Sequence, residues 1–494
     1  MIRAADSNPK VVAEVRDLVP GLEDYIRRGM EAFDVPGLAI GIVAGDDLIY
    51  AGGFGVRAKS DNKAVDTGTV FQIGSATKAF LATTMAIAVD GGKLGWDDRV
   101  VDLDPGFQLK DAWVTSEFRV FDLLAQRSGL PPYVNDFLGA LGYDEQAKIR
   151  SLRHVEPVSS FRSSFAYTNI THLIAGRIVA DAEGAADWGT VLQRELLDPL
   201  GMEDSTLTAA AIEAAPNHSR GHRYTLEGTV EIPFDQRFPY DFLGAGAINS
   251  TIEDMAAWVR LLLGDGTFEG QSIVSPENLA VTRIARVGMS DTVSYAMGWV
   301  IQQTPNGTVV WHNGGTDGYG AYVGIEPARK IGLVVLTNET NVGFPDALGA
   351  WTFDRLLDNP SVDYVAVKLE ETTERLTEQA KLFAKPAEPR PFPPLAPRVG
   401  AFKSPVFGEA AVTAAGDALV LALEETGAHL MLEPWDGDIF TVRLMPDSGF
   451  ASIAEALGPQ PVAFGEFLAG TNGKLDQLRL TFPENNQVYE FRRD

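Results

Sequence analysis

The spacing of apolar and polar positions changes several times along the chain. Residues 11–33 repeat apolar side chains at helical spacing, which predicts an opening helix. Residues 36–58 follow with two apolar runs around Gly45-Asp46-Asp47, a pattern typical of a β-hairpin. Residues 77–94 are apolar on nearly every side and stop at Gly91-Gly92, so a buried helix is expected there.

Two more helices and a return to strands complete this first region. Residues 169–184 and 251–266 have helical spacing, and the second begins with Thr-x-x-Asp and stops at glycine. Residues 295–339 contain apolar runs and an Asn306-Gly307 turn, which predict three antiparallel strands. With strands at both ends and helices between them, the pattern favours an α+β fold, an antiparallel sheet covered by helices, over a series of βαβ units.

The character of the sequence changes after residue 357. A polar, amphipathic helix is predicted at residues 369–385, and six prolines from Pro386 to Pro397 indicate a stiff, extended connector. Short alternating runs then predict a small all-β domain, a barrel or a sandwich. The expected division is a first domain at residues 1–357, a helix and linker at 358–398, and the all-β domain at 399–494.

Charge, histidines and the N-terminal sequence restrict the class of protein. A net charge of −26 disfavours nucleic acid as a partner. No run approaches the roughly 18 apolar residues that span a bilayer. The chain has no cysteine and its six histidines form no pattern with carboxylates, so no metal site is expected. Without an apolar leader the protein is predicted to be cytoplasmic, while a removed signal would leave a periplasmic or secreted protein open.

A Ser-x-x-Lys quartet, Ser75 to Lys78, stands at the start of the predicted buried helix. On a helix the two side chains share a face. A serine hydroxyl needs a base to become a nucleophile, and a lysine that burial deprives of its charge can supply one. A helix cap with a snorkelling lysine is the alternative. The quartets at Ser7 to Lys10 and Ser60 to Lys63 precede no buried helix, so Ser75 is preferred.

A Tyr-x-Asn triplet, Tyr167 to Asn169, directly precedes a predicted helix. A tyrosine hydroxyl can pass a proton to a leaving group, and an asparagine amide can hold a substrate carbonyl and Lys78. A second triplet, Tyr133 to Asn135, has the same letters. The triplet alone therefore does not identify a site.

A third element, His312-Asn313-Gly314-Gly315, lies at the end of a predicted strand. Glycine in this position allows close approach of a ligand to the backbone. The N–H groups of Gly315 and Ser75 together could form an oxyanion hole. A turn or core histidine is the alternative for His312.

Taken in order, these three elements resemble the penicillin-recognising serine hydrolases. The similarity covers most of residues 15–355 and points to the branch of class C β-lactamases, esterases and D-aminopeptidases. It is carried by stretches such as "FQIGSATKAF", "DLLAQRSGLPP", "FAYTNITHLIAG" and "HNGGTDGYGAYVGIEP". It implies a β-lactamase/transpeptidase-like fold, an antiparallel sheet flanked by helices plus an all-helical region. No G-x-S-x-G occurs, which argues against an α/β-hydrolase.

The resemblance also implies a mechanism through an acyl-enzyme, with no metal or organic cofactor. Ser75 would attack the carbonyl, and Lys78 would take its proton with Tyr167 as partner. Asn169 would position Lys78 and the substrate.

The remaining roles concern substrate and oxyanion. The N–H groups of Ser75 and Gly315 would hold the oxyanion, with Gly314 beside them. His312 would contact substrate or assist Tyr167 in proton transfer.

One departure from the family pattern changes the expected class of substrate. His312 stands where β-lactamases and carboxypeptidases of this superfamily have a lysine that helps bind the substrate carboxylate. Imidazole carries at most a partial charge near neutral pH, so that anchor is missing. His-x-Gly resembles the D-aminopeptidase, and peptide or amide substrates are therefore expected before carboxylic esters, with β-lactams third.

Other classes of function and partner stay open. D-amino-acid specificity is compatible with the resemblance, a carboxylesterase is the first alternative, and a penicillin-binding sensor without turnover is the second. The C-terminal domain is similar to the lipocalin-like domains of some relatives, which shape the cleft or mediate assembly. The expected partner is a small-molecule or peptide substrate, and a homo-oligomer is compatible with the sequence.

Overall fold

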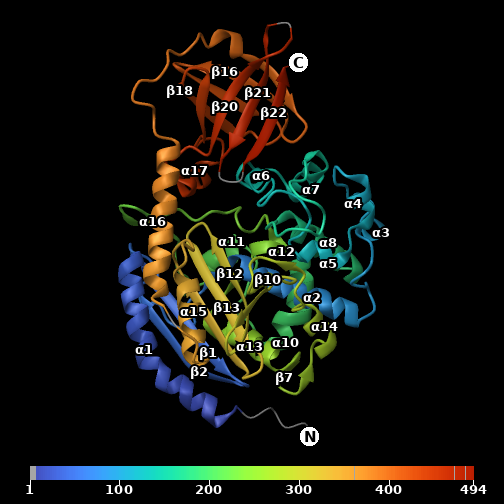
Figure 1. Ribbon diagram of the computed structural model, residues 1–494, viewed down its shortest axis with the longest axis vertical. Coiled ribbons are helices and arrows are strands. Elements are labelled where there is room, and N and C mark those ends of the chain that lie inside the picture. The colour runs from blue at the N-terminus through green and yellow to red at the C-terminus, as the bar shows by residue number, and fades with distance from the viewer. Residues whose placement is uncertain (1–6, 361, 472, 484–485, 494) are drawn as a thin grey trace.

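An eight-stranded antiparallel sheet is the middle layer of the larger of two lobes (Figure 1). The computed structural model describes residues 7–360, 362–471, 473–483 and 486–493. The strand order is β2-β1-β14-β13-β12-β11-β10-β9, so the first hairpin pairs with the last strand of the lobe. The strands are β1 (Gly37–Ala44), β2 (Asp47–Gly55), β9 (Val287–Gly288), β10 (Val293–Tyr295), β11 (Val300–Thr304), β12 (Gly307–Thr316), β13 (Tyr319–Glu326) and β14 (Ile331–Thr337).

The predicted opening hairpin is confirmed, but the prediction of three late strands is wrong. Four long strands, β11 to β14, run through that region, and the short β10 precedes them. The turn between β13 and β14 was not recognised because no glycine marks it. Lys330 closes this turn with a positive φ of 54°, a conformation that glycine usually provides.

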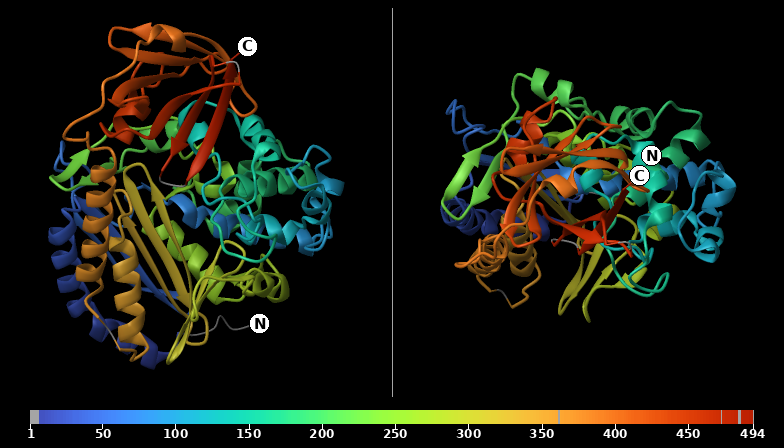
Figure 2. Two further views of the ribbon diagram at one scale, coloured as in Figure 1. Left: turned by 45° about the horizontal axis from the view of Figure 1, so that its top comes forward. Right: turned by 90° about the horizontal axis from the view of Figure 1, so that it is seen from above.

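Helices cover both faces of the sheet (Figure 2). On one face lie α1 (Pro9–Phe33) and α15 (Phe344–Leu356), with α16 (Tyr364–Leu382) packed against both. On the other face α13 (Ile252–Leu263) packs on β1 and β14, and behind it lie α2 (Thr77–Asp90) and α8 (Ile170–Glu183). The helices predicted from the sequence at these four central positions, residues 11–33, 77–94, 169–184 and 251–266, are thereby confirmed.

The remaining elements are short. The helices are α3 (Val100–Leu103), α4 (Ala112–Glu117), α5 (Val120–Leu124), α6 (Phe137–Ala140), α7 (Glu145–Ser151), α9 (Trp188–Leu192), α10 (Asp198–Leu200), α11 (Ala209–Ala214), α12 (Leu243–Gly246) and α14 (Pro276–Val281). Three two-stranded sheets pair β3 (Phe71–Gln72) with β6 (Asn249–Ser250), β4 (His222–Thr225) with β5 (Gly228–Glu231), and β7 (Thr267–Phe268) with β8 (Gln271–Ser272).

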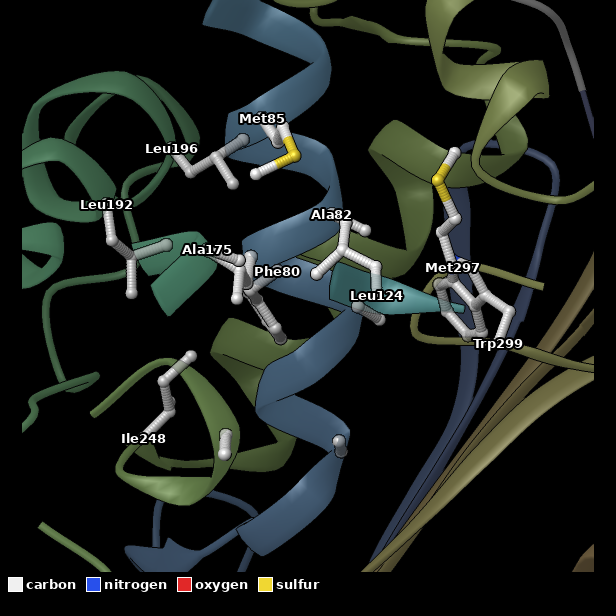
Figure 3. Close-up of a cluster of buried hydrophobic side chains, with 14 of the residues drawn as sticks. Phe80, Ala82, Met85, Leu124, Ala175, Leu192, Leu196, Ile248, Met297 and Trp299 are labelled. Atoms are coloured by element: carbon white, nitrogen blue, oxygen red, sulfur yellow. The ribbon is translucent and has the colours of Figure 1, made fainter. Parts of the chain in front are cut away.

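Helix α2 runs through the centre of the lobe. Its side chains are fully enclosed from Thr77 to Ala86, as a sequence that is apolar on nearly every side predicts. Figure 3 shows apolar side chains around this helix, among them Met85 on α2 and Leu196 beside it. Phe80 stacks on Trp258 of α13, with ring centroids 3.8 Å apart. This packing fixes the start of α2 against the sheet.

The smaller lobe is a closed eight-stranded antiparallel barrel. Its strands are β15 (Gly400–Ser404), β16 (Gly408–Ala415), β17 (Ala418–Leu423), β18 (His429–Asp436), β19 (Ile439–Leu444), β20 (Ala463–Ala469), β21 (Leu475–Phe482) and β22 (Gln487–Arg493). A helix, α17 (Ala451–Leu457), precedes β20. The prediction of a small all-β barrel or sandwich is confirmed in the form of a barrel.

The two lobes share one apolar cluster. Leu138, Leu141 and Tyr143 of the larger lobe are buried against barrel residues that include Phe407 and Phe450. The Tyr143 O–H also donates to the carbonyl of Phe407 at 2.6 Å. The barrel therefore docks directly above the helical region that follows α5 (Figure 1). Among the described residues, no helix has both the length and the apolar character needed to cross a membrane.

Candidate active site

Ser75 lies in a 3-10 turn, Gly74–Ala76, that leads directly into α2. It is the one residue between Phe71 and Phe80 that is not fully buried. Ser60 of another Ser-x-x-Lys quartet is exposed and donates to Glu231, and Ser7 lies beside Asp47. Only Ser75 combines an accessible hydroxyl with a buried lysine one turn away.

Lys78 has no exposed side-chain surface. Its Nζ lies 2.9 Å from Ser75 Oγ and 2.8 Å from the carbonyl oxygen of Ala245 on α12. Burial lowers the pKa of Lys78 to about 7, against the opposing effect of the Asp136 charge. A lysine with this pKa can accept a proton from the serine at neutral pH.

Tyr167 lies in the segment before α8, and the nearby Ser75 side chain lowers the pKa of Tyr167 against the effect of burial. Lys78 Nζ stands 4.8 Å from the centre of the Tyr167 ring. Burial raises the pKa of Tyr167 well above its ordinary value, so the phenol keeps its proton. The structure thus brings Ser75, Lys78 and Tyr167 into one cluster.

Asn169 reaches this cluster through a carboxyl group that the sequence analysis missed. It stands at the residue before α8 without capping the helix by its side chain, and its Nδ2 donates to Asp136 Oδ2 at 2.6 Å. Among the described residues, no hydrogen bond joins Asn169 directly to Lys78. Burial raises the pKa of Asp136 to about 7, while the Asn169 hydrogen bond and the Lys78 charge oppose that rise.

Gln126 holds the backbone between Tyr167 and Asn169. Its Oε1 accepts from Thr168 N at 2.6 Å, and its Nε2 donates to the Thr168 carbonyl at 3.2 Å. Gln126 has a positive φ of 53° and is almost completely buried. It was missed because the contact spans distant residues and no local spacing announces it.

His312 lies on β12 behind Tyr167, with ring centroids 6.2 Å apart. Its Nδ1 lies 2.6 Å from the Asn313 carbonyl, so this nitrogen carries the hydrogen. Its Nε2 then accepts from the Tyr295 O–H at 2.9 Å. Burial lowers the pKa of His312 to about 3, so the ring is neutral and both nitrogens are occupied. Tyr295 was also missed by the sequence analysis.

Gly314 and Gly315 bring β12 against the turn that carries Ser75. A Cβ on Gly314 would lie 1.9 Å from the Ile73 carbonyl oxygen and 3.2 Å from Ser75 N. A Cβ on Gly74 would lie 2.8 Å from Gly315 N. The two backbones touch here, and the N–H groups of Ser75 and Gly315 belong to adjoining segments.

The second Tyr-x-Asn triplet borders the same cluster. The Tyr133 ring lies 5.4 Å from that of Tyr167, and Tyr133 N donates to the Tyr167 carbonyl at 2.6 Å. Tyr133 is half exposed, so part of its ring lies at the surface beside Tyr167. The one signal available for the missed Asp136 was its position directly after this triplet.

Comparison with known proteins agrees with this fold. The family model described as Beta-lactamase matches residues 22–356. Penicillin-binding protein 4 of Amycolatopsis lactamdurans is 28% identical over 380 residues, which cover 75% of this chain and 93% of that protein. Unguisins hydrolase ungD' of Aspergillus campestris is 27% identical over 335 residues, 64% of this chain but only 61% of that hydrolase. This chain therefore matches less than two thirds of the length of the unguisins hydrolase.

A solved structure shares the fold of both lobes. The octameric penicillin-binding protein homologue from Pyrococcus abyssi has a TM-score of 0.62 at 23% identity, over 96% of this chain and 99% of that one. The resemblance to β-lactamase-like hydrolases with an appended barrel is confirmed. Because the family match covers well over half of the sequence, the chain belongs to the Beta-lactamase family of serine hydrolases.

Proposed function

We propose that the protein hydrolyses peptide or amide bonds of small or linear peptides through an acyl-enzyme formed on Ser75. The observation that carries this proposal is the contact between an accessible serine hydroxyl and a fully buried lysine. Lys78 Nζ is 2.9 Å from Ser75 Oγ, and the pKa of Lys78 is lowered to about 7. A neutral amine at this distance is a suitable general base.

In the first step Ser75 Oγ forms a bond to the acyl carbon, and its proton moves to Lys78 Nζ. The carbonyl oxygen becomes negative, and the N–H groups of Ser75 and Gly315 stabilise it. Support for this arrangement comes from the close contact of Gly314 with Ile73 and Ser75.

In the second step the bond to the leaving nitrogen breaks. Tyr167 donates its phenolic proton to the amine and regains a proton from the Lys78 ammonium. Water then attacks the acyl-enzyme, Lys78 accepts one proton from it, and that proton passes to Ser75 Oγ as the bond between Oγ and the acyl carbon breaks. Asn169 positions the cluster, and His312 forms its uncharged wall behind Tyr167.

Peptide and amide substrates rank before carboxylic esters, and both rank before β-lactams. His312 is uncharged at neutral pH because its pKa is lowered to about 3, so position 312 offers no cation to a substrate carboxylate. Asn313 donates to Asp346 at 2.7 Å and faces away from Ser75. The relative named unguisins hydrolase supports hydrolysis as the reaction class.

The test is turnover of one mixed pool followed by mass spectrometry. The pool contains L- and D-amino-acid amides, short linear peptides, p-nitrophenyl esters and a cephalosporin. Wild type is compared with Ser75→Ala and, as a matched control, with Ser60→Ala. Multiple turnovers of peptides or amides that only Ser75→Ala abolishes are expected. Turnover of esters alone would favour a carboxylesterase, a single acylation without turnover would favour a sensor, and activity in Ser75→Ala would exclude the mechanism.

A homo-oligomer belongs to the proposal because the Pyrococcus abyssi homologue is described as octameric. Light scattering on the full chain measures this directly. A mass equal to that of one chain, 53.3 kDa, would remove this part.

The proposed domain division follows the sequence prediction, with residues 1–357, 358–398 and 399–494 as catalytic domain, linker and barrel. Limited proteolysis tests it. First cleavage between Pro386 and Pro397 is the expected result, and first cleavage inside either lobe would contradict the division.

A further inference from the structure

Asp136 presents its carboxylate to the reacting groups from outside the Ser-x-x-Lys helix. Its Oδ2 accepts from Asn169 Nδ2 at 2.6 Å. Its Oδ1 is buried and has no hydrogen-bond partner among the described residues. The charge of Asp136 acts on Lys78, whose pKa it raises against the effect of burial. Asp136 thus binds the Tyr-x-Asn element by a hydrogen bond and affects Lys78 by the electrostatic effect of its charge.

The turn that carries Asp136 has an unfavourable backbone. Tyr133 and Asn135 have positive φ values of 53° and 57°. Asparagine tolerates this region, whereas tyrosine rarely adopts it. Such conformations persist where the surroundings hold them, and they gather at active sites. Here the Tyr133 N–H bond to the Tyr167 carbonyl ties the turn to the Tyr-x-Asn segment.

Strand β22 of the barrel holds the same turn from the opposite side. Gln487 Nε2 donates to the Tyr133 carbonyl at 3.1 Å, and Gln487 Oε1 accepts from Asn135 N at 3.0 Å. The Tyr489 O–H donates to Asn135 Oδ1 at 2.7 Å. Gln487, Tyr489 and Asn135 are all buried. The barrel therefore fixes the residue that directly precedes Asp136.

We propose that Asp136 is a positioning residue of the hydrolysis, which orients Asn169 and stabilises the Lys78 ammonium. That ammonium forms when Ser75 Oγ bonds to the acyl carbon and its proton moves to Nζ. The barrel keeps Asp136 in place through Gln487 and Tyr489. The inference rests on the proposed role of Ser75 as nucleophile.

Other ionisable groups face the same pair and contribute to the pH dependence. Around Lys78 these are Asp136, Tyr167, His172 and His312. Around Asp136 they are Lys78, Lys148, Asp241, Tyr167 and Tyr489. Among them Asp136 is the group that raises the pKa of Lys78. The Asp136 carboxyl carries its charge above its own pKa of about 7, and loss of that charge lowers the pKa of Lys78 and moves the acid limb of the rate to lower pH.

The experiment measures the labelling of Ser75 by a fluorophosphonate across the pH range, because this readout does not depend on the natural substrate. Asp136→Asn keeps an oxygen for Asn169 but loses the charge. We expect its maximal labelling rate to fall about tenfold, with the acid limb moved to lower pH by about one unit. Asp136→Ala loses the acceptor as well, and we expect a fall of about 100-fold with unchanged affinity for the probe.

A purely structural role would give a different result. Asp136→Asn would then lower the melting temperature without moving the acid limb, and this outcome would overturn the inference. Absence of Ser75 labelling in the wild type would instead overturn the proposed function. The two failures are therefore distinguishable.

A matched pair of variants tests the contribution of the barrel. Tyr489→Phe removes the hydrogen bond to Asn135, whereas Tyr143→Phe removes a hydrogen bond between the lobes that does not involve Asn135. We expect Tyr489→Phe to lower the maximal labelling rate about fivefold and Tyr143→Phe to leave it unchanged. Equal rates in the two variants would remove the barrel from the proposal.

Discussion

Lys78 and Lys148 are two fully buried lysines of the same lobe with different surroundings. Lys148 Nζ lies 2.7 Å from the carboxylate of Asp241 and 4.0 Å from the centre of the Phe242 ring. Lys78 Nζ has a serine hydroxyl and a carbonyl oxygen as its nearest acceptors. One lysine has a carboxylate within hydrogen-bond distance, and the other has neutral oxygens.

This difference separates a structural lysine from a candidate base. A buried ammonium is stable when a carboxylate compensates its charge, which is the situation of Lys148. A hydroxyl and a carbonyl are neutral and can also pair with a neutral amine, so Lys78 can release its proton without leaving an unpaired charge behind. Burial alone therefore does not make a lysine catalytic, whereas burial without a directly bonded carboxylate does lower its pKa.

The largest expected effect is that of Lys78→Met. Removal of the base lowers kcat/KM by about 1,000- to 10,000-fold. The melting temperature stays the same or rises, because an apolar side chain of similar volume replaces a buried polar one. Ester or amide hydrolysis and thermal unfolding measure the two quantities. If Lys78→Met kept its activity, Lys78 would be a structural lysine like Lys148 and not the base.

The reverse result is expected for Lys148→Met. Asp241, whose side chain is 21% exposed, then loses the ammonium bound to it, and the free energy of unfolding falls by about 2 kcal/mol. Urea denaturation measures this loss. Labelling of Ser75 should persist wherever the variant is folded. An unchanged free energy of unfolding together with loss of Ser75 labelling would show that Lys148 serves the reaction rather than the stability of the fold.

A third prediction concerns the strand beside Ser75. Gly314→Ala places a Cβ against the Ile73 carbonyl, which moves β12 away from the turn and lowers kcat/KM by about 100-fold. Gly288→Ala on β9 is the control, since a Cβ there meets nothing within 4 Å. Steady-state kinetics of both variants test whether the position of β12 matters to the Lys78 cluster. Equal kcat/KM values for the two variants would show that the position of β12 does not matter to the Lys78 cluster.

The smallest effect is a pH dependence. Because the base must be neutral and the pKa of Lys78 is about 7, kcat/KM should fall tenfold for each pH unit below that value. Lys381→Met, which removes an exposed lysine on α16, should show the same acid limb. A limb that moves in Lys381→Met, or one absent from the wild type, would contradict the assignment to Lys78.

Sequence alone predicts those parts of the site that local geometry determines. Ser75 and Lys78 meet because residues three apart on a helix share a face. Asp136, Gln126 and the Ala245 carbonyl enter the site through contacts between segments distant in the chain. No periodicity or spacing carries that information.

In the fold, too, the features set by local sequence patterns are predictable and those set by pairing between distant segments are not. The central helices and the opening hairpin follow from strong apolar patterns and glycine stops. The turn at Lys330 was missed because no glycine marks it, and the strands of the barrel were expected only as a group of short alternating runs. The closure of the barrel depends on pairing between β15 and β22, the first and last strands of the barrel in the sequence. No local pattern specifies this pairing.

The apolar cluster shared by the lobes has a consequence for how this protein can change. Leu138 and Leu141 are enclosed by barrel side chains rather than by their own lobe, so substitutions on either side of the boundary act on both. Such a boundary couples the two lobes in unfolding. Removal of the barrel would expose the apolar side chains of Leu138, Leu141 and Tyr143 to water, and an exposed apolar patch of this kind favours association with other molecules.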